Sequence, residues 1–135
     1  MKKFLTLEFL PLNSDLGLLI LRVVFGFSLI WFHGWGKLTR LLSGSAAVPD
    51  ILGIGAMPTT VLAVFAEVVC AVLVAVGLWS RFASVFVVAT TGCAFVFAHK
   101  MALSGMHNGQ MPLLFLAAYL TILFAGPGRY SFDRK

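Results

Sequence analysis

Charged residues are scarce in this chain, and acidic residues are the scarcest of them. Only 11% of the 135 residues are charged, against about 25% in ordinary soluble domains, and five are acidic. Hydrophobic residues make up 60% of the chain, and the mean hydropathy is +0.99. A soluble fold of this length cannot bury so much apolar surface, so we expect the chain to lie in lipid.

Cysteine and the common cofactor motifs are also largely missing. Cys70 and Cys93 form neither a CxxC motif nor a disulfide framework; we interpret them as small packing residues and leave their redox activity open. Neither G-x-G-x-x-G nor a P-loop occurs, which argues against a nucleotide cofactor. No Ser/His/Asp or Cys/His spacing indicates nucleophilic catalysis. The net charge of +5 is scattered at segment ends, so we expect the bilayer as a partner and not nucleic acid.

Four apolar runs dominate what remains. We predict an all-α, polytopic bundle of four transmembrane helices in one domain over 15–133, with spans at 16–42, 58–79, 81–101 and 109–125. Asn13, Ser14 and Asp15 are typical N-cap residues, and Pro58 suits the first turn of a helix. Residues 1–14 are predicted to form a retained interfacial segment, because no cleavage site follows them.

The lysines and arginines predict how the bundle is oriented. If the N-terminus is cytoplasmic, six basic residues lie on that side: Lys2, Lys3, Arg81, Arg129, Arg134 and Lys135. The opposite side then carries three: Lys37, Arg40 and Lys100. We therefore expect both termini in the cytoplasm.

Glu67 is the residue on which the functional interpretation depends. It is the only charged residue within 58–79, and a carboxylate at that depth costs several kcal/mol unless it is paired or protonated. Arg22, His33, Lys37 and His99 also lie in apolar segments. Polar side chains in a span turn toward the bundle interior because lipid cannot solvate them.

Helical geometry places these polar groups in one sector of the bundle. At 100° per residue, Arg22, His33 and Lys37 share a face of the first span with Gly26 and Gly36. A rise of about 1.5 Å per residue puts Arg22 at about 9 Å and Glu67 at about 18 Å from the cytoplasmic ends, with both histidines further out. We predict an Arg22–Glu67 ion pair and a cavity toward the outer side.

In this interpretation His33, His99, Lys37 and Tyr119 line the cavity. Glu67, His33 and His99 are the candidate catalytic residues, and Arg22, Lys37 and Tyr119 are the candidate ligand-binding residues. Apart from Tyr119, each also has a simpler explanation. A buried Arg22–Glu67 pair can serve packing alone, the histidines can lie among lipid headgroups, and Lys37 can extend to the surface. We expect no metal, because no HxxxH or ExxH spacing occurs and Lys37 would repel a cation. A haem held between His33 and His99 is disfavoured as well.

Several segments together resemble the DoxX family. The first span contains LRVVFG at 21–26 and HGWGKL at 33–38, and Glu67 follows in the second span. The remaining pieces are GLWSR at 77–81, His99 at the end of the third span, and GPGRYS-x-D at 126–133. One departure is Val69-Cys70, near which family members often have a glycine pair. In the C-terminal block we expect the glycines and Pro127 to turn the chain and Arg129 to pair with Asp133.

The resemblance implies a small four-helix protein of the prokaryotic inner or plasma membrane, associated with quinone-linked oxidoreductases. Together with the polar pocket, it suggests a quinone-binding membrane subunit with a redox partner protein. Histidine and lysine can hydrogen-bond quinone oxygens, and glutamate or histidine can relay protons. The alternatives are a non-catalytic scaffold or assembly subunit and a small carrier. Whether the chain is itself an enzyme stays open. Its glycine-bearing faces indicate a homo-oligomer.

Overall fold

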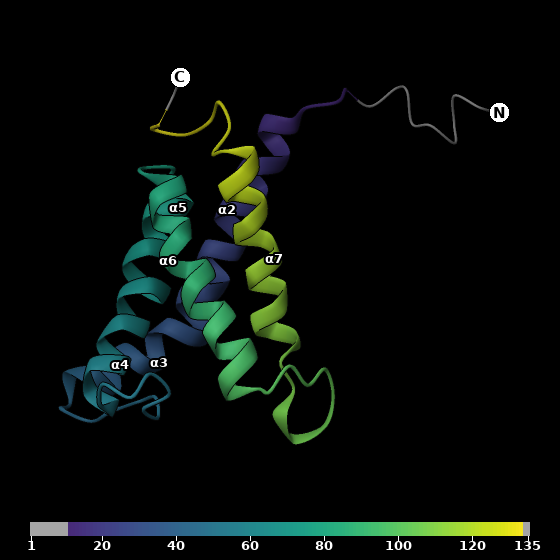
Figure 1. Cartoon of the computed structure of the whole chain (residues 1–135). Helices are drawn as coiled ribbons and strands as arrows, with labels where there is room; N and C mark the ends of the chain where they lie inside the picture. Colours follow the sequence, from purple (N-terminus) through teal and green to yellow (C-terminus); the bar gives the residue numbers. More distant parts are fainter. Residues whose placement is uncertain (1–10, 134–135) are drawn as a thin grey trace.

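The computed structural model describes residues 11–133, and within them it is all-helical. Four helices are long and apolar enough to cross a membrane: Ser14–Leu42, Ala56–Val76, Ser80–Ala98 and Gly105–Ala125. They pack side by side, and the first begins at the end of the bundle where the fourth finishes (Figure 1). The predicted four-helix membrane fold is confirmed. The side of the membrane on which the termini lie stays a prediction, and most of the predicted interfacial segment 1–14 falls outside the described residues.

The winding of the first three spans changes part-way along. The first consists of α2 (Ser14–Leu29), the π-helical η1 (Ile30–Gly34) and α3 (Trp35–Leu42). The second consists of α4 (Ala56–Val64), the π-helical η2 (Phe65–Cys70) and α5 (Ala71–Val76). The third joins α6 (Ser80–Cys93) to the π-helical η3 (Ala94–Ala98), and the fourth joins the short 3₁₀ helix η4 (Gly105–His107) to α7 (Gln110–Ala125). The π-helical turns of η1, η2 and η3 are wider than those of an α-helix; such turns are rare in proteins and occur frequently at functional sites.

The helix ends follow local chemistry, with small shifts from the predicted bounds. The Asn13 side chain accepts a hydrogen bond from Leu16 N at 3.0 Å and caps α2. The second span ends earlier than predicted, because Gly77 adopts a left-handed φ of 83° that a helix cannot continue. The third span also ends early, since Lys100 and Met101 have φ values of 51° and 56°. These turns define two ends of the molecule. The terminal end holds residues 77–80 and 126–133, and the opposite end holds residues 43–55 and 99–109.

The first and second spans approach closely at two glycines. A Cβ on Gly26 would lie 3.1 Å from the Ala71 carbonyl oxygen, and one on Gly34 would lie 2.9 Å from that of Glu67. Close packing therefore does not need a glycine pair in the second span, because the first span supplies the small residues. These two glycine positions are filled by contacts within the chain, so the homo-oligomer stays a prediction.

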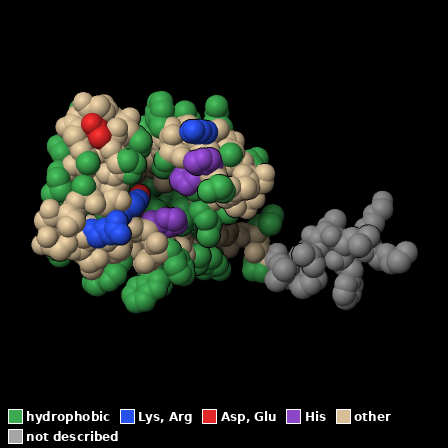
Figure 2. Space-filling model, turned by 90° about the horizontal axis from the view of Figure 1, so that it is seen from below, with side chains coloured by type: hydrophobic (Ala, Val, Ile, Leu, Met, Phe, Trp, Pro, Cys, Tyr) green, Lys and Arg blue, Asp and Glu red, His purple; other side chains and the backbone are tan. Residues whose placement is uncertain are grey.

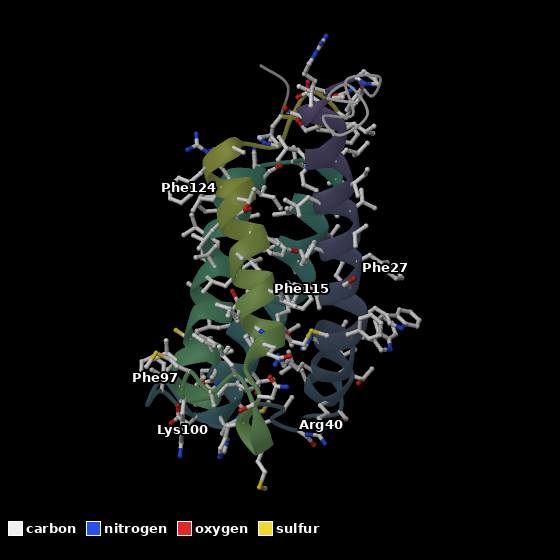
Figure 3. The ribbon with its side chains drawn as sticks, turned by 90° about the vertical axis from the view of Figure 1, so that its right-hand side faces the viewer. Phe27, Arg40, Phe97, Lys100, Phe115 and Phe124 are labelled. Atoms are coloured by element: carbon white, nitrogen blue, oxygen red, sulfur yellow. The ribbon has the colours of Figure 1, made fainter. Side chains whose placement is uncertain are left out.

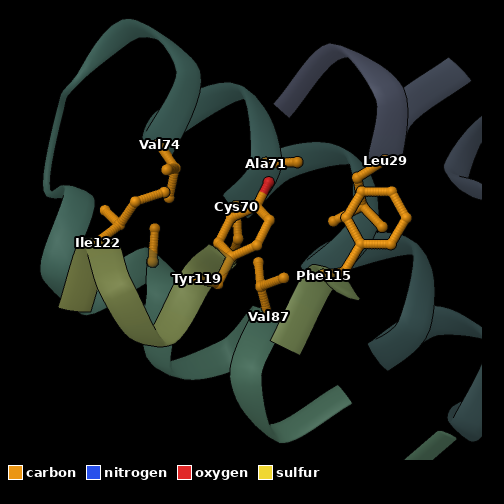
Figure 4. Packing of buried hydrophobic residues seen from close by; sticks show 9 residues of the cluster. Leu29, Cys70, Ala71, Val74, Val87, Phe115, Tyr119 and Ile122 are labelled. Atoms are coloured by element: carbon orange, nitrogen blue, oxygen red, sulfur yellow. The ribbon is translucent and has the colours of Figure 1, made fainter. Parts of the chain in front are cut away.

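A compact apolar core fills the space between the spans, and the outer surface is also apolar. Leu29, Phe115 and Tyr119 pack in the core with residues of α5 and α6 (Figure 4). Phe27 and Phe124, by contrast, point outward from the bundle and are exposed (Figure 3). A water-soluble monomer rarely exposes such large apolar side chains over a wide area. Both the core and the surface therefore fit a bundle surrounded by lipid.

Candidate functional site

The buried carboxylate of Glu67 is paired with Lys37. The Lys37 Nζ donates to both carboxylate oxygens, at 2.5 Å each. The Glu67 side chain is 7% exposed and that of Lys37 is 27% exposed. An ammonium group has three hydrogens, so the partly open Lys37 keeps one for a third acceptor. This pair joins the first span to the second near the opposite end of the bundle.

Side-chain direction explains why Lys37, and not Arg22, reaches Glu67. Helical side chains lean toward the N-terminus of their own helix. The first span runs from the terminal end to the opposite end, so Lys37 leans inward toward Glu67 and Arg22 leans away from it. The predicted Arg22–Glu67 ion pair is therefore wrong, and Lys37 does not extend freely to the surface. The lean of helical side chains was the sequence signal that would have identified the correct partner.

His33 lies between this ion pair and the fourth span. Glu67, Lys37 and His99 all lie near enough to act electrostatically on its imidazole. Its ring meets that of Phe115 edge-on, with centroids 5.3 Å apart. No hydrogen bond to another described residue engages either nitrogen, so the half-buried imidazole can still bind a ligand. The structure thus brings together Glu67, His33 and Lys37, three of the six predicted site residues.

His99 lies at the same end but is tied to its own span. Its Nδ1 is 2.8 Å from the Ala94 carbonyl oxygen. A carbonyl only accepts, so this bond requires a hydrogen on Nδ1 and leaves Nε2 as the free nitrogen. His99 follows directly after η3, whereas His33 lies in η1 and Glu67 in η2. All three predicted catalytic residues therefore lie within or next to a π-helical segment, which no sequence pattern had indicated.

A small apolar cavity opens beside His33, between the first and fourth spans. Its volume is about 180 Å³, and its walls include Phe25, His33 and Phe115. Phe25 meets Phe115 edge-on at 5.7 Å. Our sequence interpretation did not select these two phenylalanines, because one aromatic residue among 18 in an apolar chain carries no special signal. Within residues 11–133, no group of three or more His, Cys, Asp or Glu side chains is placed to hold a metal ion.

The face at the opposite end shows how these groups reach the surface. Viewed from that end, histidine and basic side chains gather around a hollow near the middle of the face, with a carboxylate deep inside it (Figure 2). Arg40 and Lys100 lie at this same end (Figure 3). This is the end at which the cavity was predicted to open, but of the predicted lining residues only His33 borders the cavity beside Phe115. The opening toward the outer side stays a prediction.

Arg22 is fully buried near the terminal end, where it holds the C-terminal segment. Its Nη2 donates to the Tyr130 carbonyl oxygen at 2.7 Å, and its Nη1 lies 3.4 Å from the carbonyl oxygens of Val74 and Ala75. Val74 is two helical turns from Glu67, so Arg22 and the Lys37–Glu67 pair lie at different depths. The structure therefore places Arg22 outside the cluster around Glu67.

Asp133 does not pair with Arg129, contrary to expectation. Its two carboxylate oxygens accept hydrogen bonds from Trp79 N at 2.8 Å and Ser80 N at 2.7 Å, which caps α6. The backbone N–H of Arg129 instead donates to Asp15 Oδ1 at 2.9 Å. The GPGRYS-x-D block therefore fastens the terminal end through Asp15, Arg22 and the start of α6.

Tyr119 lies in the core and not at the cavity wall. It is fully buried, its ring packs near Cys70, and its hydroxyl points toward Ala71 (Figure 4). Among residues 11–133 that hydroxyl has no hydrogen-bond partner. Cys70 is buried beside it and Cys93 is half-buried, and both are free thiols. Tyr119 is therefore placed one helical turn from Phe115, on the core side of the cavity.

Comparison with known proteins agrees with this architecture. The family model DoxX matches residues 17–100, well over half of the chain. That range contains Arg22, His33, Lys37, Glu67 and His99, and it leaves the fourth span and the C-terminal block outside the match. Comparisons with curated proteins and with solved structures gave no match. The chain is a membrane-spanning helical protein that belongs to the DoxX family.

Proposed function

We propose that this protein is the membrane subunit of a quinone-linked oxidoreductase and that it binds the quinone head group beside His33. The observation that carries the proposal is the position of His33, which lines an aromatic cavity and lies close enough to the Lys37–Glu67 pair for their charges to act on its imidazole. Membership in a family linked with oxidoreductase-associated membrane subunits supports it. We further propose that the protein resides in the inner or plasma membrane of a prokaryote.

The polar groups at the site suit the two requirements of quinone reduction, which are stabilisation of charge on the carbonyl oxygens and delivery of protons to them. A quinone takes up two electrons and two protons to become a quinol, and charge develops on its carbonyl oxygens before they are protonated. The His33 imidazole and the remaining Lys37 hydrogen can donate to one such oxygen. Glu67 and His99 are titratable groups that can pass protons to that position. The electrons must come from a redox partner protein, since we assign no electron-carrying group to this chain.

The apolar walls suit the rest of the ligand. Phe25 and Phe115 offer ring faces and edges to an aromatic head group. The cavity lies between the first and fourth spans, where an isoprenoid tail can leave the site directly into lipid. Binding sites of this kind combine apolar walls with a few convergent polar groups.

Titration of the purified protein with a ubiquinone or menaquinone analogue tests this proposal. We expect saturable binding, and a Kd at least about tenfold higher in the double variant Glu67→Gln, His33→Ala, since lost hydrogen bonds to charged groups cost about 1.5–3 kcal/mol. His107→Ala is the matched control, because His107 is exposed and lies in η4. Absence of saturable binding, or equal affinity in the double variant, would contradict the proposal.

A scaffold role is the second candidate, and the buried pairing itself favours it. The Lys37–Glu67 pair joins two spans, as Arg22 joins α2 to α5 and to the C-terminal segment. A scaffold predicts that Glu67→Gln lowers the folded yield while the redox activity of a partner persists in whatever protein folds. Measuring thermal stability in detergent alongside partner activity separates the two roles.

A further inference from the structure

A second, larger cavity lies at the terminal end, far from the Glu67 site. It is an open groove of about 910 Å³ between the start of α6 and the C-terminal segment. Trp79 and Phe82 form part of its apolar wall, and both are more than 60% exposed. Arg81 and Arg129 contribute the basic part, at the level where the spans end. Nothing in the proposed quinone chemistry uses this groove.

The two guanidinium groups are available for a ligand, whereas the two carboxylates in the wall are engaged. Asp133 accepts two backbone N–H groups at the start of α6, and Asp15 accepts the Arg129 N–H. Arg81 uses Nε for the Leu123 carbonyl oxygen at 3.0 Å, which leaves both of its terminal nitrogens for another acceptor. Within residues 11–133, neither Arg81 nor Arg129 forms an ion pair with a carboxylate.

We propose that this groove binds an anionic phospholipid, with its headgroup phosphate held by Arg81 and Arg129. Guanidinium groups match phosphate oxygens in geometry and charge. Trp79 and Phe82 provide an apolar surface for the first part of an acyl chain, and aromatic residues of this kind favour the membrane interface. A soluble phosphate would make no use of that aromatic wall.

The position of the groove in the bundle favours a lipid over other occupants. It lies at the start of the first and third spans and at the end of the fourth, where headgroups of the surrounding bilayer are already present at high concentration. The charge distribution predicts that this end faces the cytoplasm, whose leaflet carries the anionic lipids. A membrane lipid therefore has the required charge and the required place.

The backbone at Trp79 fixes the groove wall. Trp79 has a left-handed φ of 49°, which is uncommon for a residue other than glycine. Asp133 holds the strained turn by accepting Trp79 N and Ser80 N. The hydrogen bonds to Asp133 therefore fix the turn that carries Trp79, and with it the start of the helix that carries Arg81.

Fluorescence quenching by brominated lipids tests the proposal in the full-length protein. Trp79 is made the only tryptophan by Trp31→Phe and Trp35→Phe, and the protein is titrated with brominated phosphatidylglycerol or phosphatidylcholine in micelles. We expect tighter binding of phosphatidylglycerol. Arg81→Gln with Arg129→Gln should remove that preference, at about fivefold per arginine, which corresponds to about 1 kcal/mol per basic residue.

The control variant is Arg40→Gln with Lys100→Gln, which removes two positive charges at the opposite end and should keep the preference. Equal quenching by the two lipids in the parent protein would overturn the proposal, and it is the result expected if an acidic protein segment covers the groove. Displacement of the lipid by millimolar glycerol 3-phosphate would overturn it in favour of a free phosphate. Loss of the preference only in the control variant would do so as well.

Discussion

Lys37 and Glu67 form an ion pair that joins the first span to the second. Both carboxylate oxygens of Glu67 are bonded to the same ammonium group. Removing one member of a buried pair leaves an uncompensated charge, whereas replacing both is often nearly neutral. The pair is therefore a sensitive probe of the site, independent of any ligand.

We expect Lys37→Met to lower the free energy of unfolding by about 3 kcal/mol, because Glu67 is then buried without its partner. Adding Glu67→Gln should restore most of that loss, with a coupling energy between the two positions of about 0.5–3 kcal/mol. Unfolding in mixed micelles, followed by tryptophan fluorescence, measures both values. Arg40→Met is the control at an exposed cation of the same helix. Additive effects of the two substitutions would contradict the observed pairing.

Most of the candidate site residues were predictable one by one, but the partner of Arg22 was not. Glu67, His33 and His99 stand out in the sequence because charge and imidazole are rare in apolar spans. Their depths also followed from the helical rise. What failed was the pairing of Arg22, since the acceptor that it finds, the Tyr130 carbonyl, lies 108 residues away in an irregular segment. No local pattern in the sequence places that segment.

At the scale of the helices, Gly34 determines whether the first span can bring its polar side chains to Glu67. It lies between His33 and Lys37 in sequence, directly against the backbone of Glu67. Gly36, two residues further on, has no atom within 4 Å of where a Cβ would lie. The two glycines therefore provide a matched comparison within one span.

Gly34→Ala should destabilise the bundle by about 1–3 kcal/mol, because the added methyl group overpacks a contact that cannot relax freely. Gly36→Ala should be neutral or stabilising by up to about 1 kcal/mol, since alanine favours the helical backbone and meets nothing. Thermal unfolding of both variants in the same detergent makes the comparison. Equal effects would show that helix propensity, and not close packing, governs this position.

The helices themselves were predictable, although their internal winding was not. Four long apolar runs, the Asn13 cap and the glycine-rich ends placed each span to within four residues of the ends in the structure. The π-helical segments had no counterpart in the hydrophobic pattern, because one wide turn shifts the phase of a helix too little to show in a uniformly apolar sequence. They nevertheless contain or adjoin all three predicted catalytic residues.

At the scale of the whole molecule, the C-terminal segment closes the bundle. Asp133 N also donates to the Gly77 carbonyl oxygen at 2.9 Å, so the segment is bonded to the turn between the second and third spans from both sides. Arg22 bonds the same segment from α2. Three spans are thereby joined at one end by residues 130–133, which lie outside the family match.

The contribution of Asp133 should depend on pH. Partial burial alone would raise the pKa of this carboxyl, but hydrogen bonds from Ser80 and Trp79 and the charge of Arg22 hold the pKa below its usual 3.8. Ionised Asp133 therefore stabilises the fold above about pH 3.8, and this contribution is lost as the pH falls through the lower folded-state value.

We expect Asp133→Asn to cost about 1 kcal/mol at pH 7, the usual value of a helix cap. The difference from the parent protein should shrink as the pH falls below 3.8. Denaturant titrations of the two proteins at pH 7, 5 and 3 provide the measurement. A difference that stays constant over this range would contradict the cap.

The most direct test of the quinone site is photolabelling of the membrane-embedded protein with an azidoquinone. We predict that the label attaches to peptides covering residues 24–33 and 111–115, that unlabelled quinone prevents it, and that Glu67→Gln reduces it. Labelling spread over lipid-facing positions, or confined to the groove at Trp79 and insensitive to competition, would contradict a quinone site at His33.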